Sequence, residues 1–145
     1  RPFTYAHGSV QQNYGNQNAA LAHPQQANFI EMVGITTFRW KRLLFEGKAV
    51  TAQFGLDSAG KNMGHNIFVS YSNRAREYGN YMLQGIKTTL VQGEFRAVYL
   101  LYAPLNLKVE GGVIARKTSN VIGNDKAVYC WLGFRTALFN DYKDY

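Results

Sequence analysis

Hydrophobic and polar residues alternate with a period of two along much of the chain. In the stretch 89–103 the odd positions include Phe95 and Leu101, whereas the even positions include Glu94 and Arg96. Alternation over ten or more residues is typical of half-buried β-strands. We therefore expect five long antiparallel strands, each next to its neighbour in sequence, over residues 27–40, 44–57, 88–103, 107–117 and 126–139.

The same parity predicts which side chains share a face of the sheet. One face is apolar and is expected to point outward; it carries Phe95, Tyr99, Leu101, Val109, Val113, Leu132 and Phe134. The opposite face is expected to point inward and carries both signs of charge, at Glu94, Arg96, Lys108, Glu110, Arg116 and Arg135. The segment 44–57 breaks the rule, because Glu46 and Lys48 share parity with Val50 and Phe54; a β-bulge near Gly47 would restore the alternation.

The lengths of the strands and of their connections favour a membrane barrel. A tilted strand needs about 9–11 residues to cross a bilayer, whereas the mean strand of globular proteins has about 5–6. Short connections at 41–43 and 104–106 alternate with longer ones at 58–87 and 120–125, and outer-membrane barrels combine short periplasmic turns with long extracellular loops. The sequence thus predicts an all-β, antiparallel portion of a transmembrane β-barrel, in which 1–145 is one domain and 6–26 and 58–87 are extracellular loops.

Composition narrows the function classes. Hydrophobic residues make up 46% of the chain and charged residues 17%, which excludes a charged disordered tail, a coiled coil and a collagen-like repeat. The net charge of +7 is compatible with nucleic acid, anionic lipid or acidic polysaccharide. Basic residues cluster only at Arg39, Lys41 and Arg42, and no nucleic-acid-binding motif is present, so nucleic acid is not an expected partner. A soluble, basic all-β domain that binds glycan or nucleic acid remains the alternative, with the charged face as its wetted outside.

The titratable residues form no pattern typical of an enzyme, a cofactor site or a metal centre. His7, His23 and His65 match no metal-ligand spacing, and the single cysteine, Cys130, lies among apolar positions. Glu94 and Glu110 share their face with the cations Arg96, Lys108 and Arg116, so a ladder of ion pairs inside the barrel explains them without catalysis. We therefore expect a protein that is not an enzyme and that needs no cofactor.

Aromatic residues alternate with Asn, Gln and Arg in the two long loops. Flat aromatic faces beside amide groups suit sugars, and arginines would suit an acidic glycan. The alternative is that these side chains pack the loops over the mouth of the barrel. The candidate glycan contacts are Tyr14, Phe68, Tyr71, Arg74, Arg76, Tyr78 and Tyr81.

Several short motifs resemble the RemB-type gliding-motility proteins and the related Wzi-like capsule-assembly barrels of Bacteroidota-type bacteria. They include Arg1-Pro-Phe-Thr-Tyr5, Asn13-Tyr-Gly-Asn16, Phe54-Gly-Leu-Asp57, Glu77-Tyr-Gly-Asn80 and Gly133-Phe-Arg-Thr136. The resemblance covers nearly the whole chain, but Gln25 and Gln26 stand where the family has Leu-Gly. It implies a location in the outer membrane of a Gram-negative bacterium and a structural, polysaccharide-associated or assembly-partner role, in contact with membrane lipid and with a motility or secretion complex.

Five strands cannot close a barrel, because the smallest bacterial barrels have eight. An open edge in lipid would leave unpaired backbone groups, each costing several kcal/mol. We therefore expect the chain to be the C-terminal segment of a larger barrel, whose missing N-terminal strands, or strands of another chain, pair with the free edge of the strand 126–139. The aromatic tail with Tyr142 and Tyr145 is expected to act as an assembly signal.

Overall fold

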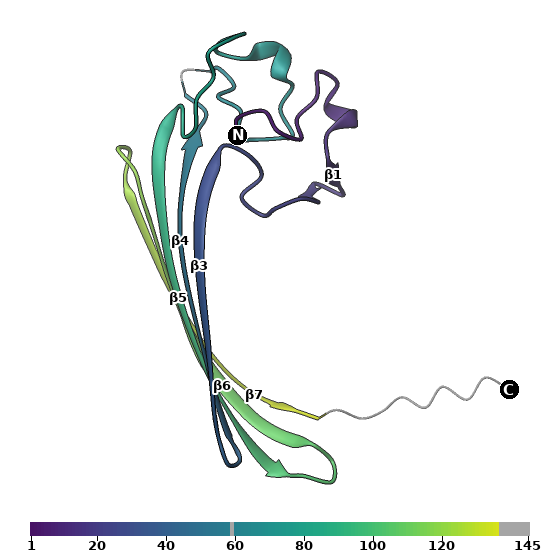
Figure 1. The fold of residues 1–145 in the computed structure, drawn as a ribbon, viewed down its shortest axis with the longest axis vertical. Helices are drawn as coiled ribbons and strands as arrows, with labels where there is room; N and C mark the ends of the chain where they lie inside the picture. Colours follow the sequence, from purple (N-terminus) through teal and green to yellow (C-terminus); the bar gives the residue numbers. More distant parts are fainter. Residues whose placement is uncertain (59, 137–145) are drawn as a thin grey trace, which may run out of the picture. The chain divides into compact units, whose positions relative to one another are not determined.

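The computed structural model describes residues 1–58 and 60–136, and its regular structure is almost entirely β (Figure 1). Five long strands form one sheet: β3 (Phe29–Trp40), β4 (Leu43–Leu56), β5 (Ile86–Tyr102), β6 (Leu107–Ser119) and β7 (Asn124–Arg135). The first loop holds a two-stranded antiparallel ladder of β1 (Gly15–Asn16) and β2 (Ala19–Ala20). Two short 3₁₀-helices are η1 (Val10–Gln12) and η2 (Tyr71–Asn73).

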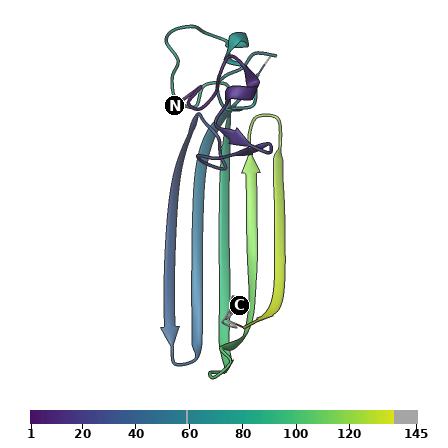
Figure 2. The ribbon, with the colours of Figure 1, turned by 90° about the vertical axis from the view of Figure 1, so that its right-hand side faces the viewer.

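The five long strands lie in the order β3-β4-β5-β6-β7, antiparallel and side by side in chain order (Figure 2). The predicted topology is thereby confirmed. Within the described residues β3 and β7 each have a single neighbour, so each has one edge without a partner strand. Among these residues no helix is long and apolar enough to cross a membrane.

The predicted strand ends need small corrections. β3 begins at Phe29 and not at 27, β5 begins at Ile86 and not at 88, and β6 extends to Ser119. The connection expected at 120–125 is a tight turn, because Asn120 Oδ1 accepts hydrogen bonds from the backbone N–H groups of Ile122 and Gly123. Residues 137–139 of the last predicted strand, and the tail with Tyr142 and Tyr145, lie outside the described residues.

The chain forms two compact units, each of which takes parts of the long strands. The first comprises Arg1–Met32, Val50–Val91 and Lys117–Asp125. Its core consists of Ala52, Phe54 and Leu90, packed against Phe29 and Leu56, and Ile67 is buried in the loop region. These apolar contacts give the long loops a packed base.

Asn28 ties the loops of the first unit to its strands. The side chain is fully buried, at 0% exposure, and its amide nitrogen donates to the carbonyl oxygens of Gly55 (3.0 Å) and Gln84 (2.9 Å). Its amide oxygen accepts from the N–H of Leu83 at 2.7 Å. A Cβ on Gly55 would lie 1.9 Å from the Gln84 oxygen, so only glycine permits this close approach. One side chain thus joins three segments that are far apart in sequence.

The second unit comprises Val33–Ala49, Gln92–Arg116 and Lys126–Tyr145. Val98 is its one fully buried hydrophobic residue in the described part of the chain. Its large exposed hydrophobic residues are Val33, Ile35, Phe38, Trp40, Phe95, Tyr99, Leu101, Tyr102, Leu105, Val113, Val128, Tyr129, Leu132 and Phe134. A soluble domain buries such side chains against another layer. The described residues of this unit form a sheet that is largely uncovered.

The expected bulge near Gly47 is not needed. β4 runs without interruption from Leu43 to Leu56, and Glu46 has the same parity as the buried Val50 and Phe54. Glu46 is accommodated because it meets a cation on the neighbouring strand, Arg96, at 2.9 Å. The alternation of the sequence failed here because one parity of β4 carries a charge in the second unit and apolar side chains in the first.

Candidate functional site

Four charged side chains of alternating sign form a continuous ladder across β4, β5, β6 and β7. Arg96 donates from one guanidinium nitrogen to Glu46 (2.9 Å) and from another to Glu110 (2.7 Å). The same Glu110 oxygen accepts from Arg135 at 3.1 Å. Because each inner member contacts two opposite charges, the ladder is a network and not a set of isolated surface pairs. We call Glu46, Arg96, Glu110 and Arg135 the ion-pair ladder.

The inner members of the ladder are shielded from solvent. The Glu110 side chain is 14% exposed and that of Arg96 is 22% exposed, although the described residues place no second layer over them. The neighbouring strands provide this shielding. Removal of Arg96 would leave the Glu46 carboxylate, which is 35% exposed, without its ion-pair partner.

Of the six residues of the predicted charge ladder, the structure brings three together, Arg96, Glu110 and Arg135, and it adds Glu46, which the sequence argument missed. The opposite charges of Glu46 and Arg96 on adjacent strands could have signalled the pair. Glu94, Lys108 and Arg116 form no ion pair with any described residue: Glu94 and Lys108 are half-buried, and Arg116 is exposed.

The apolar residues of opposite parity are exposed, as predicted. Leu132 is 79% exposed and Phe134 is 74% exposed, and Phe95, Tyr99, Leu101 and Val113 are also exposed. Val109 departs from the prediction, since it is only half-buried. We call the exposed residues Phe95, Tyr99, Leu101, Val113, Leu132 and Phe134 the apolar face.

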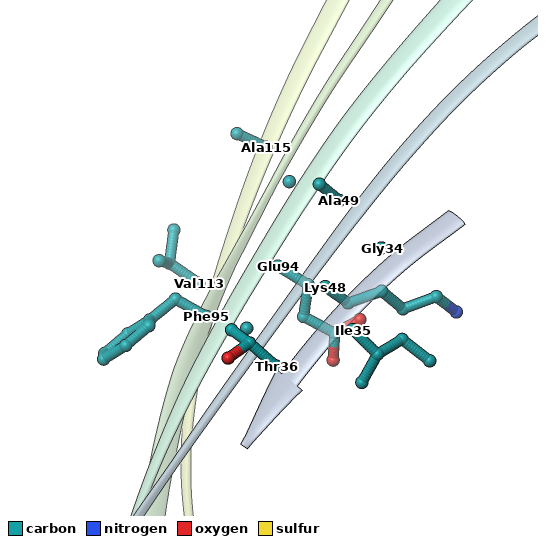
Figure 3. A pocket seen from close by; sticks show the side chains of 11 residues that line it. Gly34, Ile35, Thr36, Lys48, Ala49, Glu94, Phe95, Val113 and Ala115 are labelled. Carbon is teal, nitrogen blue, oxygen red and sulfur yellow. The ribbon is translucent and has the colours of Figure 1, made fainter. Parts of the chain in front are cut away.

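The two faces are separated by the thickness of the sheet. Phe95 and Val113 point to one side of the strands, and Lys48 and Glu94 point to the other (Figure 3). Phe95 stacks on Phe45 of β4, with ring centroids 6.1 Å apart. Around these residues lies a hollow of about 610 Å³, and its lining includes glycines from three adjacent strands: Gly34, Gly47 and Gly93.

Exposed aromatic side chains gather at the ends of β3, β5 and β7 in the second unit. Phe38 and Trp40 end β3, Tyr99 and Tyr102 end β5, and Phe134 is near the end of β7. These three strands run in the same direction, because alternate strands of an antiparallel sheet are parallel. The C-terminal ends of these three strands, which carry the aromatic residues, therefore lie at the same end of the sheet along the strand direction. The Lys41 ammonium, at the turn between β3 and β4, lies 5.5 Å from the centroid of the Trp40 ring.

The loops of the first unit contain a pocket of about 410 Å³, and three of the seven candidate glycan contacts line it. Its lining comprises Tyr71, Arg74 and Tyr78 together with Pro2, Phe3, Glu77 and Asn80. Arg74 donates to a Glu77 carboxylate oxygen at 2.9 Å and lies 5.7 Å from the centroid of the Tyr71 ring. We call this site the loop pocket; it presents phenol rings, an amide and a neutralised ion pair.

The other four candidate glycan contacts lie outside the loop pocket. Tyr14 packs on Tyr5, with ring centroids 5.5 Å apart, and Phe68 covers Gly15. Arg76 lies 5.8 Å from the centroid of the Tyr81 ring. For Tyr14 and Phe68 the alternative prediction, that aromatic residues pack the loops, describes the contacts better. Because Glu77 neutralises Arg74, the loop pocket suits a neutral sugar better than the acidic one suggested by the arginines.

The histidines contact other parts of the first unit. His23 lies 3.0 Å from a Glu31 oxygen and stacks on Phe29, and His65 hydrogen-bonds the Ala27 carbonyl oxygen at 2.8 Å. Within residues 1–58 and 60–136 there is no group of three or more His, Cys, Asp or Glu side chains arranged to hold a metal ion. Cys130 is free and exposed on β7, at the same parity as Leu132.

Comparison of the chain with protein-family models, with curated protein sequences and with solved structures finds no match.

Proposed function

We propose that the chain is part of an outer-membrane β-barrel, with the apolar face toward lipid and the ion-pair ladder toward the barrel interior. The observation that carries this proposal is the contrast between the two faces of the second unit. On one face the apolar-face side chains are exposed, whereas on the other face the inner members of the ladder are shielded and the ladder is internally neutral. Transmembrane barrels have this pattern, apolar outside and polar inside.

The free-energy cost of exposing hydrophobic side chains to water supports an apolar environment around the apolar face. Full exposure of a Leu or Phe side chain to water costs about 1.5–3 kcal/mol relative to burial. Leu132 and Phe134 alone are more than two-thirds exposed, and the other apolar-face residues add to the cost. A lipid phase removes this cost without a second protein layer.

The aromatic ends of β3, β5 and β7 support the same assignment. Barrels carry girdles of aromatic residues at the membrane–water interfaces, where the rings sit at headgroup level. Trp40 with Lys41 and Arg42 at the β3–β4 turn fits the end of such a span. In this proposal the short turns are periplasmic and the long loops extracellular.

The free edges of β3 and β7 require further strands in the proposed barrel. Lipid offers no hydrogen bonds to an open strand edge, so each edge must pair with another strand. Strands outside the five described here, from the same polypeptide or from another chain, would close the sheet. The resemblance to RemB-type and Wzi-like proteins is consistent with this assembly and with a structural role in gliding motility or capsule assembly that does not involve catalysis.

Fractionation of cells that produce the protein tests the membrane assignment. We expect the protein in the outer-membrane fraction, resistant to extraction by alkaline carbonate and released by detergent, because lipid covers the apolar face. Recovery in the soluble fraction after lysis without detergent would contradict the proposal and favour the soluble all-β alternative.

The loop pocket is proposed to contact surface polysaccharide. Tyr71 and Tyr78 offer aromatic faces, and Asn80 offers both a donor and an acceptor. We expect Tyr78→Ala to lower binding of the cell's own surface polysaccharide at least about fivefold, an effect of about 1 kcal/mol, since Tyr side chains provide large contact areas.

Tyr129→Ala is the matched control for Tyr78→Ala. Tyr129 is also an exposed tyrosine, but it lies on β7 and not in a loop. Binding can be measured by glycan capture on protein held in detergent micelles. Equal binding by Tyr78→Ala and the wild type would contradict a role for the loop pocket.

A further inference from the structure

A second pocket, of about 220 Å³, lies at the turn ends of the strands in the second unit, and five of its lining residues are cations. They are Arg39, Lys41, Arg42, Lys108 and Arg135. Its remaining lining residues are Leu43, Leu44, Val98, Leu100 and Asn106. We call this site the basic pocket.

The charge of the basic pocket is not balanced by its own lining, which contains no Asp or Glu in the described part of the chain. Arg135 is paired with Glu110 in the ion-pair ladder, so the unbalanced charge comes from Arg39, Lys41, Arg42 and Lys108, none of which forms an ion pair with a described residue. The Lys41 ammonium lies over the Trp40 ring, and a cation–π contact leaves the positive charge of the lysine intact. Cations that line one pocket repel one another, and a bound anion relieves this repulsion.

The backbone holds the basic pocket in place. The carbonyl oxygen of Arg42 accepts a hydrogen bond from the N–H of Leu100 at 2.9 Å, which fixes the β3–β4 turn against β5. Asn106, at φ +49°, closes the β5–β6 turn, where its N–H donates to the Ala103 carbonyl oxygen at 3.0 Å. Lys41 and Arg42 thus lie in a tight turn, and Arg39, Lys108 and Arg135 lie in the strands β3, β6 and β7.

The lining of the basic pocket indicates the chemistry of its ligand. Three of the five cations are arginines, whose planar guanidinium groups bind phosphate oxygens in a bidentate manner. The pocket is smaller than the roughly 300–1,000 Å³ typical of sites for drug-sized ligands. The four apolar lining residues, Leu43, Leu44, Val98 and Leu100, carry no charge that would compete with an anion for the cations. We propose that the basic pocket binds the phosphate group of a small phosphorylated molecule or of an anionic lipid headgroup.

This inference goes beyond the proposed barrel and loop pocket, because the charge imbalance exists whatever surrounds the apolar face. The test uses the full-length protein in nanodiscs of phosphatidylcholine, titrated with inorganic phosphate at constant ionic strength by calorimetry. The double variant Arg42→Ala/Lys108→Ala removes two cations from the pocket. The matched control Arg116→Ala/Lys117→Ala removes the same charges from β6 at positions outside the pocket.

We expect the pocket variant to bind phosphate at least about tenfold more weakly than the wild type and the control variant to stay within about twofold, because only the pocket variant loses charge-assisted hydrogen bonds to the phosphate. A second arm distinguishes the sources of the phosphate. Native mass spectrometry of protein incubated with phosphatidylglycerol would show a lipid adduct that the pocket variant loses. Inorganic phosphate binding without this adduct supports a small phosphorylated molecule, and the adduct supports a lipid.

Two results would overturn the proposal. One is the absence of binding to both inorganic phosphate and phosphatidylglycerol. The other is an equal loss of binding in the pocket and control variants, which would show only nonspecific attraction to a basic protein. Thermal unfolding of both variants checks that they remain folded.

Discussion

Leu132→Arg should lower the free energy of unfolding of the membrane-embedded protein by about 2–4 kcal/mol, the cost of a cation on the lipid side of a barrel near the bilayer midplane. Leu132 is 79% exposed on β7 and shares its parity with Phe134 and Cys130. In water such a change at an exposed position is nearly neutral. Denaturant titration of the protein in bilayers measures the difference.

Val121→Arg is the matched control for Leu132→Arg. Val121 is 89% exposed, but it lies in the turn between β6 and β7. Lipid at the apolar face therefore predicts a large cost for Leu132→Arg and a change of less than about 0.5 kcal/mol for Val121→Arg. Equal and small effects of the two substitutions would place Leu132 in water.

Asn28→Ala should destabilise the first unit by about 3–5 kcal/mol, because it leaves up to three buried backbone groups without their hydrogen-bond partner. Those groups are the carbonyl oxygens of Gly55 and Gln84 and the N–H of Leu83. Loss of the amide also removes the link between the first loop, β4 and the segment before β5. Equilibrium unfolding followed by intrinsic fluorescence measures the effect.

Asn18→Ala separates the hydrogen bonds of Asn28 from its backbone conformation. Both asparagines have positive φ, +57° for Asn28 and +63° for Asn18, but Asn18 is exposed in the turn between β1 and β2. Alanine at either position incurs a similar backbone cost, about 1 kcal/mol. If Asn28→Ala destabilises the protein no more than Asn18→Ala does, the buried hydrogen bonds contribute little.

The strands and their order could be predicted because the sequence features that specify them involve only residues close together in the chain. Period-two alternation depends only on neighbouring residues, and short connections at Lys41 and Asn106 force adjacent pairing. The same parity placed Arg96, Glu110 and Arg135 on one face. Whether two charges on that face touch depends on register and side-chain reach, which alternation does not specify. The sequence argument therefore also predicts Glu94, Lys108 and Arg116 as members of the ladder, although they form no ion pair with a described residue.

The architecture of the loops could not be predicted in the same way. Asn28 meets partners 27 and 56 positions away, and no local pattern marks an asparagine that is to be buried. The β1–β2 hairpin depends on positive φ at Gln17 and Asn18, which the sequence shows only weakly, since neither residue is glycine. The lining of the loop pocket likewise combines Pro2 and Phe3 with residues about 70 positions later in the sequence, such as Tyr71 and Arg74.

Cys130 allows the most direct test of the central claim, that the apolar face contacts lipid. It is exposed on β7 at the parity of Leu132, and it is the single cysteine of the sequence, so an environment-sensitive fluorophore can be attached there in protein embedded in membranes. Cys130→Ser identifies any signal from other sites, and Val121→Cys in the Cys130→Ser background provides a label in a turn. The account predicts that brominated lipids quench the Cys130 label strongly and that aqueous iodide does not, with the reverse for the label at position 121. Quenching of both labels by iodide alone would contradict it.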